Sequence, residues 1–525
     1  MRCFVGDRLR GDGSRNRGHA LRIVLITTEA VPFAKTGGLA DVCGALPIRL
    51  ARRGHQCTVF MPAFRQIHSA GLPIQSTDIS FAVPIGDHVI GGRLLVSKLP
   101  ESDVTVYFLD QPQYFNRPAL YGDGHGDYRD NCERFAFFCR GALHAIDRLD
   151  LQPEIVHCND WQTGLIPAYV RTGLEHHRWM PQAATVMTIH NLAYQGRFWH
   201  WDMLLTGLDW TYFNPAGMEF YGHLNLLKTG IVFADAISTV SPQYAREIQT
   251  SEHGCGLEGV LANRHRDLTG IINGVDSSHW NPRTDRLLLA NYDQDNWAEG
   301  KGVNRRSVRA EFGLPDDPNI PMIGLIGRLA EQKGWDLILA AMHRLLEEQR
   351  PLQWVILGTG DSHYQEELQR LADHYPGVLG LRLGFSNELA HRIEAASDIF
   401  LMPSRYEPCG LNQLYSLMYG AVPVVHPTGG LFDTVVNATP ESIAAGTATG
   451  FYLPEYSSAG LIDALWRAAL VRWDDWATWQ QIVRTGMQQD FSWRRSAQLY
   501  EHLYTETIEK KRARVAAPAP RPPRA

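Results

Sequence analysis

The stretch that decides the fold, TTEAVPFAKTGGLADVCGALP at residues 27–47, lies between an apolar segment and a helical pattern. The apolar segment RIVLI, 22–26, predicts a buried strand, and ADVCGALPIRLARRG, 40–54, predicts a helix. Lys35, Gly37 and Gly38 stand at the turn between them. Glycines let a backbone approach a ligand closely, and a helix start offers free N–H groups to an anion. The turn therefore fits a phosphate, although a helix entry packed tightly on its strand explains the glycines equally well.

Length and composition describe a globular chain of more than one domain. The 525 residues are too many for one hydrophobic core. Hydrophobic residues make up 44% of the chain and charged residues 20%, as in water-soluble proteins. The net charge of -6 argues against a nucleic-acid partner, because binding a phosphate backbone requires an excess of Lys and Arg. We find no apolar run of about 18 residues, so no membrane helix is expected.

Both ends of the chain are predicted to be disordered. Residues 1–20 are rich in Arg and Gly and lack the apolar core of a signal peptide, and residues 513–525 are rich in Pro, Ala and Arg. None of the eight cysteines forms a C-x-x-C pair, so neither a zinc site nor a redox motif is predicted. Free thiols are typical of the reducing cytosol, which makes the cytoplasm the expected location.

Strand-like and helix-like segments alternate in two blocks, which predicts two doubly wound α/β domains. Residues 276–304 interrupt the alternation, so we predict an N-terminal domain over 21–285 and a C-terminal domain over 286–512, whose last helices return to the first domain. The predicted strands are RIVLIT, QCTVFMP, VTVYFLD, EIVHC, ATVMTIH and AISTVSP in the first block, and MIGLIG, WVILGTG, LGLRLGF, IFLMPS and VPVVH in the second. Parallel sheets of this kind bind ligands at the carboxyl ends of their strands.

The sequence T-G-G-L occurs once in each block, at 36–39 and at 428–431. Both copies follow an apolar strand and begin a helix, so the two domains could hold one phosphate-bearing ligand from both sides. A chance repeat of four residues remains an alternative. Neither copy is a G-x-G-x-x-G or a G-x-x-x-x-G-K-[ST] motif, which argues against a nicotinamide enzyme and against P-loop chemistry.

Further charged residues follow predicted strands of the second block. Arg328 and Lys333 in GLIGRLAEQKGWD suit a diphosphate, although paired surface charges would look the same. In SRYEPCGLNQLYS, Glu407 precedes a helix start at Cys409 and is suited to accept hydrogen bonds from sugar hydroxyls. An acid favoured by the helix dipole is the alternative.

Two more polar residues end strands of the first block. His190 in TIHNLAYQG and Asp160 in HCNDWQTG lie where an α/β sheet places its ligand. A structural role is equally compatible with each side chain.

These motifs together resemble bacterial glycogen synthases and plant starch synthases. The resemblance runs from about residue 21 to about residue 505 and includes KTGGLADV, DWQTGLIP, TIHNLAYQG, GLEGVL, GIINGVD, GRLAEQKGWD, SRYEPCGLNQLYS and TGGLFDTV. It implies a GT-B fold, in which two Rossmann-like domains face each other across a cleft. It also implies retaining transfer of glucose from ADP-glucose to an α-1,4-glucan such as glycogen, with no cofactor and no essential metal.

The resemblance assigns roles to named positions. Arg328 and Lys333 would hold the diphosphate, Glu407 would bind or polarise the transferred glucose, and His190 would lie beside the reacting sugar. These four form the predicted catalytic set. The predicted donor-binding set comprises Lys35, Gly37, Gly38, Asp160, Asn273, Cys409, Gly410, Leu411, Thr428, Gly429 and Gly430.

Some positions depart from related transferases. Tyr415 occupies the place of the second glutamate of an E-x7-E pattern, and His426 and Pro427 replace a basic pair before T-G-G. Asn159 stands where some relatives have histidine. The alternative functions are the same transfer from UDP-glucose or to another acceptor, a non-catalytic sugar-nucleotide or glucan-binding protein, and a phosphorylase. The sequence does not indicate an oligomeric state.

Overall fold

The structure is a computed structural model that describes residues 19–123 and 126–516. Of the two predicted extensions, residues 1–18 and 517–525 lie outside the described residues. The last helix, α18 (Trp493–Ala516), continues four residues into the predicted tail, so residues 513–516 are helical. No helix in the described ranges is long and apolar enough to cross a membrane.

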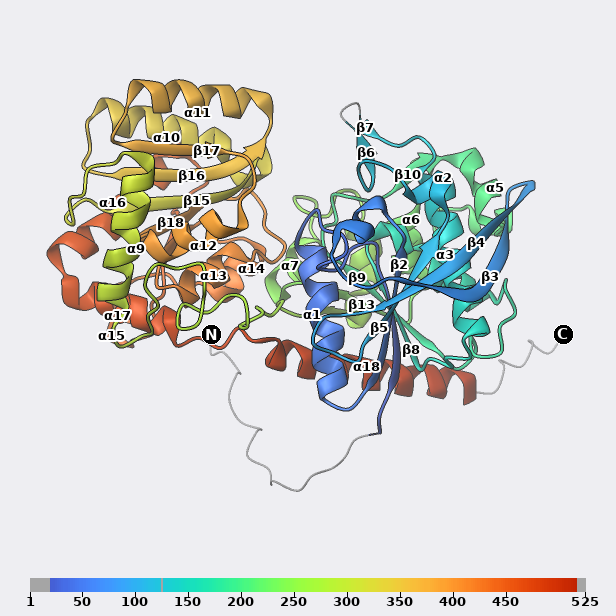
Figure 1. The fold of residues 1–525 in the computed structure, drawn as a ribbon. Helices are drawn as coiled ribbons and strands as arrows, with labels where there is room; N and C mark the ends of the chain where they lie inside the picture. Colours follow the sequence, from blue (N-terminus) through green and yellow to red (C-terminus); the bar gives the residue numbers. More distant parts are fainter. Residues whose placement is uncertain (1–18, 124–125, 517–525) are drawn as a thin grey trace.

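The first domain is built on a nine-stranded sheet within the described residues (Figure 1). Its strand order is β14-β13-β9-β8-β1-β2-β5-β4-β3, and all neighbours are parallel except the pairs β3/β4 and β4/β5. The strands are β1 (Arg22–Ile26), β2 (Gln56–Pro62), β3 (Gln75–Ile85), β4 (His88–Lys98), β5 (Thr105–Asp110), β8 (Ile155–Asn159), β9 (Ala184–Ile189), β13 (Ala236–Thr239) and β14 (Leu268–Gly270).

The central strands are apolar because both faces of the sheet are covered. In β1, Val24 is paired with Thr58 of β2 on one side and with Val156 of β8 on the other.

The helices of the first domain are α1 (Gly38–Arg52), α2 (Pro112–Phe115), α3 (Asn131–Arg148), α4 (Leu165–Thr172), α5 (Met203–Thr206), α6 (Leu226–Phe233), α7 (Pro242–Glu247) and α8 (Glu258–Asn263). Short strands outside the main sheet are β6 (Gly122–Asp123), β7 (Gly126–Asp127), β10 (Arg197–Trp199), β11 (Glu219–Phe220) and β12 (His223–Asn225).

The second domain contains a six-stranded, fully parallel sheet in the order β17-β16-β15-β18-β19-β20. Its strands are β15 (Met322–Leu329), β16 (Gln353–Gly360), β17 (Leu379–Leu383), β18 (Ile399–Met402), β19 (Val422–Val425) and β20 (Phe451–Tyr452). Its helices are α9 (Trp297–Phe312), α10 (Trp335–Glu347), α11 (Ser362–His374), α12 (Asn387–Ala396), α13 (Asn412–Met418), α14 (Gly429–Thr434), α15 (Pro440–Ala444), α16 (Ser458–Asp474) and α17 (Trp476–Met487).

Helix α18 lies against the first domain although it follows the second in sequence (Figure 1). It contacts α1 and β9 and buries Trp493, Tyr500 and Tyr504 in the first-domain core. The Tyr504 hydroxyl and His157 Nδ1 are 2.8 Å apart, so α18 also makes a buried polar contact with β8. The C-terminal helix thus joins the domains a second time, in addition to the segment between β14 and α9.

Candidate active site

The turn between β1 and α1 is held by a buried acid that the sequence analysis did not select. Glu29, 3% exposed, accepts hydrogen bonds from the hydroxyl of Thr36 at 2.6 Å and from that of Tyr121 at 2.7 Å. Glu29 belongs to the quoted stretch, and its place directly after a buried strand was the available signal. Lys35 is about half exposed and lies 2.7 Å from Asp41, so its charge stands at the start of α1.

The glycines of this turn face space that the described chain does not fill. A Cβ added to Gly37 would have no described atom within 4 Å, and one added to Gly38 would meet Leu411 Cδ1 at 3.8 Å, an ordinary contact. Close packing against the β1–α1 loop occurs instead at Gly44, where an added Cβ would lie 2.4 Å from Val31. Tight packing therefore does not explain Gly37 and Gly38, and donor contacts of these two glycines stay a prediction.

Asp160 and His190 lie together at the carboxyl ends of β8 and β9. The backbone N–H of His190 donates to Asp160 Oδ1 at 2.8 Å, and His190 Nε2 lies 2.9 Å from Asn159 Oδ1. Burial lowers the pKa of His190 to about 3, so its ring is neutral at pH 7. Asn159, the departure noted in the sequence, is thus a direct partner of His190.

Asp160 has a backbone conformation that favours glycine. Its φ of 56° and ψ of -179° lie in a region that residues with a side chain rarely adopt and that costs about 1–3 kcal/mol. Burial raises the pKa of the Asp160 carboxyl to about 7. A strained, partly buried acid at the carboxyl end of a parallel strand is characteristic of a functional site.

The second domain contributes two cations and the predicted glucose-binding acid. Lys333 Nζ lies 2.6 Å from Glu407 Oε2, which also accepts a hydrogen bond from Ser404 at 3.1 Å. Arg328 is the second-last residue of β15, and its guanidinium lies 3.4 Å from the hydroxyl of Tyr194 in the first domain. All of these groups come from segments at or just beyond the carboxyl ends of β15, β18 and β9.

The loop at 409–411 is where the second domain meets the first-domain turn. Cys409 is buried within the hydrophobic core cluster of the first domain, and burial raises its pKa to about 12, so it remains a thiol. Leu411 faces Gly38, and Gly410 has the positive φ of 70° that favours glycine. Asn273 Oδ1 is buried, and among the described residues it has no hydrogen-bond partner. The donor contact of Asn273 stays a prediction.

The second T-G-G copy is packed differently from the first. A Cβ on Gly429 would lie 2.0 Å from the carbonyl oxygen of Glu407, and one on Gly430 would lie 1.9 Å from that of Cys409. These glycines are therefore required for close packing on the segment that carries Glu407. Donor contacts of Thr428, Gly429 and Gly430 stay a prediction.

Helices α7 and α14 connect the two domains, because each carries a carboxylate that accepts hydrogen bonds at the start of the other helix. Glu247, at the end of α7, accepts a hydrogen bond from the backbone N–H of Gly429 at 3.0 Å. Asp433, near the end of α14, accepts hydrogen bonds from the Ser241 hydroxyl at 2.6 Å and the Gln243 N–H at 2.8 Å. Each helix start thus receives a carboxylate from the other domain, as its dipole favours. We call these contacts the α7–α14 clamp.

We expect Asp433→Ala to loosen the clamp without unfolding either domain. Two donors at the start of α7 would lose a charged acceptor, and such a hydrogen bond contributes about 1.5–3 kcal/mol. Hydrogen exchange measured by mass spectrometry should be at least about tenfold faster at the Gln243 amide. Glu366→Ala, which removes an exposed acid from α11, is the matched control. Unchanged exchange at α7 in Asp433→Ala would contradict the clamp.

Two departures noted in the sequence have structural explanations. Tyr415 is stacked on Trp280 with ring centroids 3.8 Å apart, and Trp280 is in turn stacked on His391. The position is therefore an aromatic packing site that would not suit an exposed glutamate. His426 Nδ1 lies 2.9 Å from the carbonyl oxygen of Ser404, and burial lowers its pKa, so it does not replace a permanent cation.

Comparison with known proteins places this geometry in a family. Residues 22–263 match the family model of the starch synthase catalytic domain, and residues 304–469 match that of glycosyl transferases group 1. The chain is 53% identical to a glycogen synthase of Rhodopirellula baltica, over 94% of this chain and 99% of that protein. It is 46% identical to a glycogen synthase of Syntrophotalea carbinolica, over 93% and 99%.

The fold has a solved counterpart. The catalytic domain of starch synthase IV from Arabidopsis thaliana, bound to ADP and acarbose, superposes with a TM-score of 0.86 at 32% identity, over 94% of this chain and all of that one. The predicted GT-B class, with two Rossmann-like doubly wound domains, is confirmed. Because it is 46–53% identical to these glycogen synthases over nearly its whole length, the chain belongs to the family of bacterial glycogen synthases and starch synthases.

Proposed function

We propose that this chain transfers glucose from ADP-glucose to the non-reducing end of an α-1,4-glucan, with retained configuration and release of ADP. Its family membership makes it a glycosyltransferase. The observation that carries the proposal is the meeting of two predicted donor-binding loops. No described atom lies within 4 Å of a Cβ added to Gly37, and a Cβ added to Gly38 would lie 3.8 Å from Leu411 of the 409–411 loop. The donor assignment is supported by the related starch synthase IV, which binds ADP.

The charged groups suit stabilisation of a leaving diphosphate. Departure of ADP builds negative charge on a phosphate oxygen, and preorganised cations lower the free energy of that transition state. Arg328 and Lys333 supply two such cations next to the domain boundary. The Lys333–Glu407 pair lets one cation orient the glucose-binding carboxylate while its remaining N–H groups face the phosphate.

Retention follows from the placement of the acid. Inversion would require a base on the face of the sugar opposite the leaving group. Glu407 instead pairs with Lys333, a proposed ligand of the diphosphate, so we place the carboxylate and the leaving group on the same side of the sugar. His190 is neutral and could accept or donate a hydrogen bond to a sugar hydroxyl without adding charge. A same-face transfer therefore fits these residues best.

An exposed aromatic cluster suits a glucan acceptor. Trp199, Trp201 and Trp210 are 61%, 49% and 39% exposed, and neighbouring rings in this cluster lie 5.4–6.3 Å apart. They follow β9 in the chain, on the same connection that carries His190 and Tyr194. Large exposed aromatic side chains mark binding surfaces, and sugar rings stack on aromatic faces.

A donor panel with a glycogen primer tests the proposal. We expect turnover with ADP-glucose well above turnover with UDP-glucose, measured as nucleoside diphosphate released and glucose incorporated. Preference for UDP-glucose would leave the proposed glucose transfer in place and show that UDP-glucose, not ADP-glucose, is the donor. Binding of donor without turnover would instead support a non-catalytic protein. We disfavour that outcome because Lys35, Arg328, Lys333 and Glu407 are all present.

A further inference from the structure

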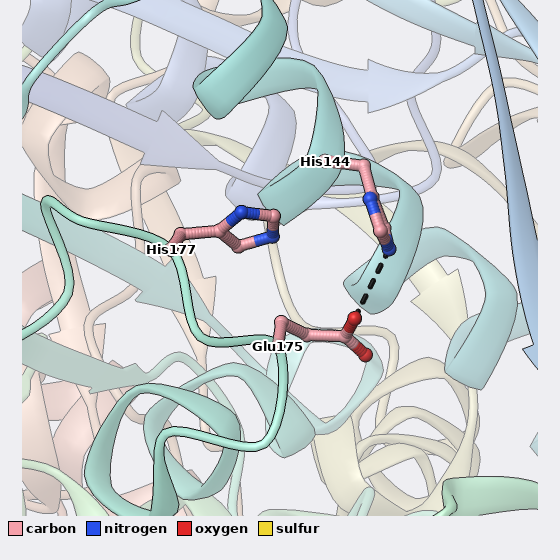
Figure 2. A group of neighbouring side chains, drawn as sticks. All are labelled: His144, Glu175 and His177. Atoms are coloured by element: carbon pink, nitrogen blue, oxygen red, sulfur yellow. Dashed lines mark ion pairs between the residues drawn. The ribbon is translucent and has the colours of Figure 1, made fainter.

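Three potential metal ligands of the first domain lie close together, outside the proposed donor site (Figure 2). His144 lies near the end of α3, and Glu175 and His177 lie in the connection from α4 to β9. His144 Nε2 is 3.0 Å from Glu175 Oε2, and one ligand atom from each residue lies within 4.8 Å of the others. Within residues 19–123 and 126–516, this is the one group of three or more His, Cys, Asp or Glu side chains so arranged.

Two ring nitrogens of this group lack a hydrogen-bond partner among the described residues. His177 Nε2 is buried and, in the described part of the chain, has no hydrogen-bond partner. His144 Nε2 is buried too, and although it lies near Glu175, no hydrogen bond of adequate geometry satisfies it. Buried polar atoms without a partner are rare, and a bound ion is one of their few explanations.

The residues around the group hold the three ligands in place. Asp147 lies 3.4 Å from Nδ1 of His177, the nitrogen not needed for a metal, and Trp179 is stacked on the same ring. Arg140 lies 2.5 Å from Glu175 Oε1, which leaves Oε2 for another partner. A carboxylate on the second nitrogen of a histidine is the usual support of a metal ligand.

We propose that His144, Glu175 and His177 bind one divalent transition metal ion, best matched by Zn²⁺. Two imidazoles and one carboxylate are ligands that Zn²⁺ accepts, with the fourth position open to water. The cluster lies where α3 leads into the start of β8 and where the 173–183 connection leads into the start of β9. Asp160 and His190 lie at the opposite ends of these strands. The ion therefore fastens that connection to α3 and takes no part in the transfer.

Zn²⁺ binding to the full-length protein tests this site. The protein should be prepared without a histidine tag, treated with EDTA and titrated with Zn²⁺ alone by calorimetry. We expect one equivalent to bind and to raise Tm by about 5 °C when Zn²⁺ is present at about 100 times its Kd. Co²⁺ in place of Zn²⁺ should give the visible absorption of a four-coordinate site.

Variants separate this site from binding to the other histidines of the chain. His177→Ala should weaken Zn²⁺ binding by at least about tenfold and reduce the Tm shift at the same Zn²⁺ concentration to about half or less. Asp147→Asn should weaken binding by about tenfold. His176→Asn changes an exposed neighbouring histidine and should bind as the parent does. Glycosyl transfer by the parent should be equal with and without Zn²⁺. The proposal would be overturned if the parent bound no stoichiometric Zn²⁺, or if His177→Ala and a folded His144→Asn variant both bound Zn²⁺ as tightly as the parent does. The cluster would then be an ion-pair network of Arg140, His144 and Glu175.

Discussion

Replacing Arg328 or Lys333 by alanine is expected to lower kcat by about 10²–10³-fold. Each side chain is proposed to stabilise the charge that develops on the departing diphosphate, and removal of one such donor costs about 3 kcal/mol of transition-state stabilisation. The loss should appear in kcat at saturating ADP-glucose, because the interaction strengthens as the bond breaks. Steady-state rates with a glycogen primer provide the measurement.

Lys333→Ala also leaves the Glu407 carboxylate without its ion-pair partner, so stability must be measured in parallel. The double variant Lys333→Ala/Glu407→Gln removes both charges and should restore any stability lost, without restoring kcat. Arg405→Ala is the matched control, since Arg405 lies on the loop that carries Glu407 but pairs with Glu331 at 3.1 Å. It should keep kcat within about twofold. Near-normal turnover in both Arg328→Ala and Lys333→Ala would exclude the proposed role of these cations.

Asp160→Gly is expected to lower kcat by about 10²-fold with little change in the free energy of unfolding. Glycine adopts the observed φ and ψ without strain, which recovers about 1–3 kcal/mol. The same change removes the acceptor of the His190 N–H, and loss of a buried acceptor costs a similar amount. The His190 segment would no longer be held in place, and a displacement of about 1 Å can cost about 10²-fold in rate.

Asp160→Asn tests whether the side chain acts by its shape or by its charge. Asparagine keeps an oxygen acceptor for the His190 N–H, so a positioning role predicts kcat within about tenfold of the parent. A loss equal to that of Asp160→Gly would show that the carboxylate itself takes part. If Asp160→Gly were fully active, Asp160 would have neither role, and its strained backbone would need another explanation.

The positions of the parallel strands along the chain were predictable from sequence because buried strands of α/β sheets are continuous apolar runs. Each of the eleven predicted strands corresponds to a strand of the two large sheets. The antiparallel hairpin β3/β4 was missed. Its residues alternate between exposed and buried positions, as in strands at a sheet edge, and an analysis that searched for apolar runs followed by helices does not detect them.

The surroundings of the proposed site could not be predicted from local sequence patterns. The two T-G-G copies are identical in sequence, yet Gly37 faces open space and Gly429 packs on the backbone of Glu407. That difference depends on a segment 22 residues away from Gly429 in sequence, which local patterns do not reveal. The same applies to the acids of the α7–α14 clamp, Glu247 and Asp433, whose partners belong to the other domain.

The most direct test of the central claim is the configuration of the new bond. Proton NMR of the product formed from ADP-glucose carrying a ¹³C label at C1 reports both the linkage and the anomeric configuration in one spectrum. The account predicts an α-1,4-linked glucose at the non-reducing end, formed together with ADP. A β-linked product would contradict it, because that product requires attack from the face opposite the diphosphate.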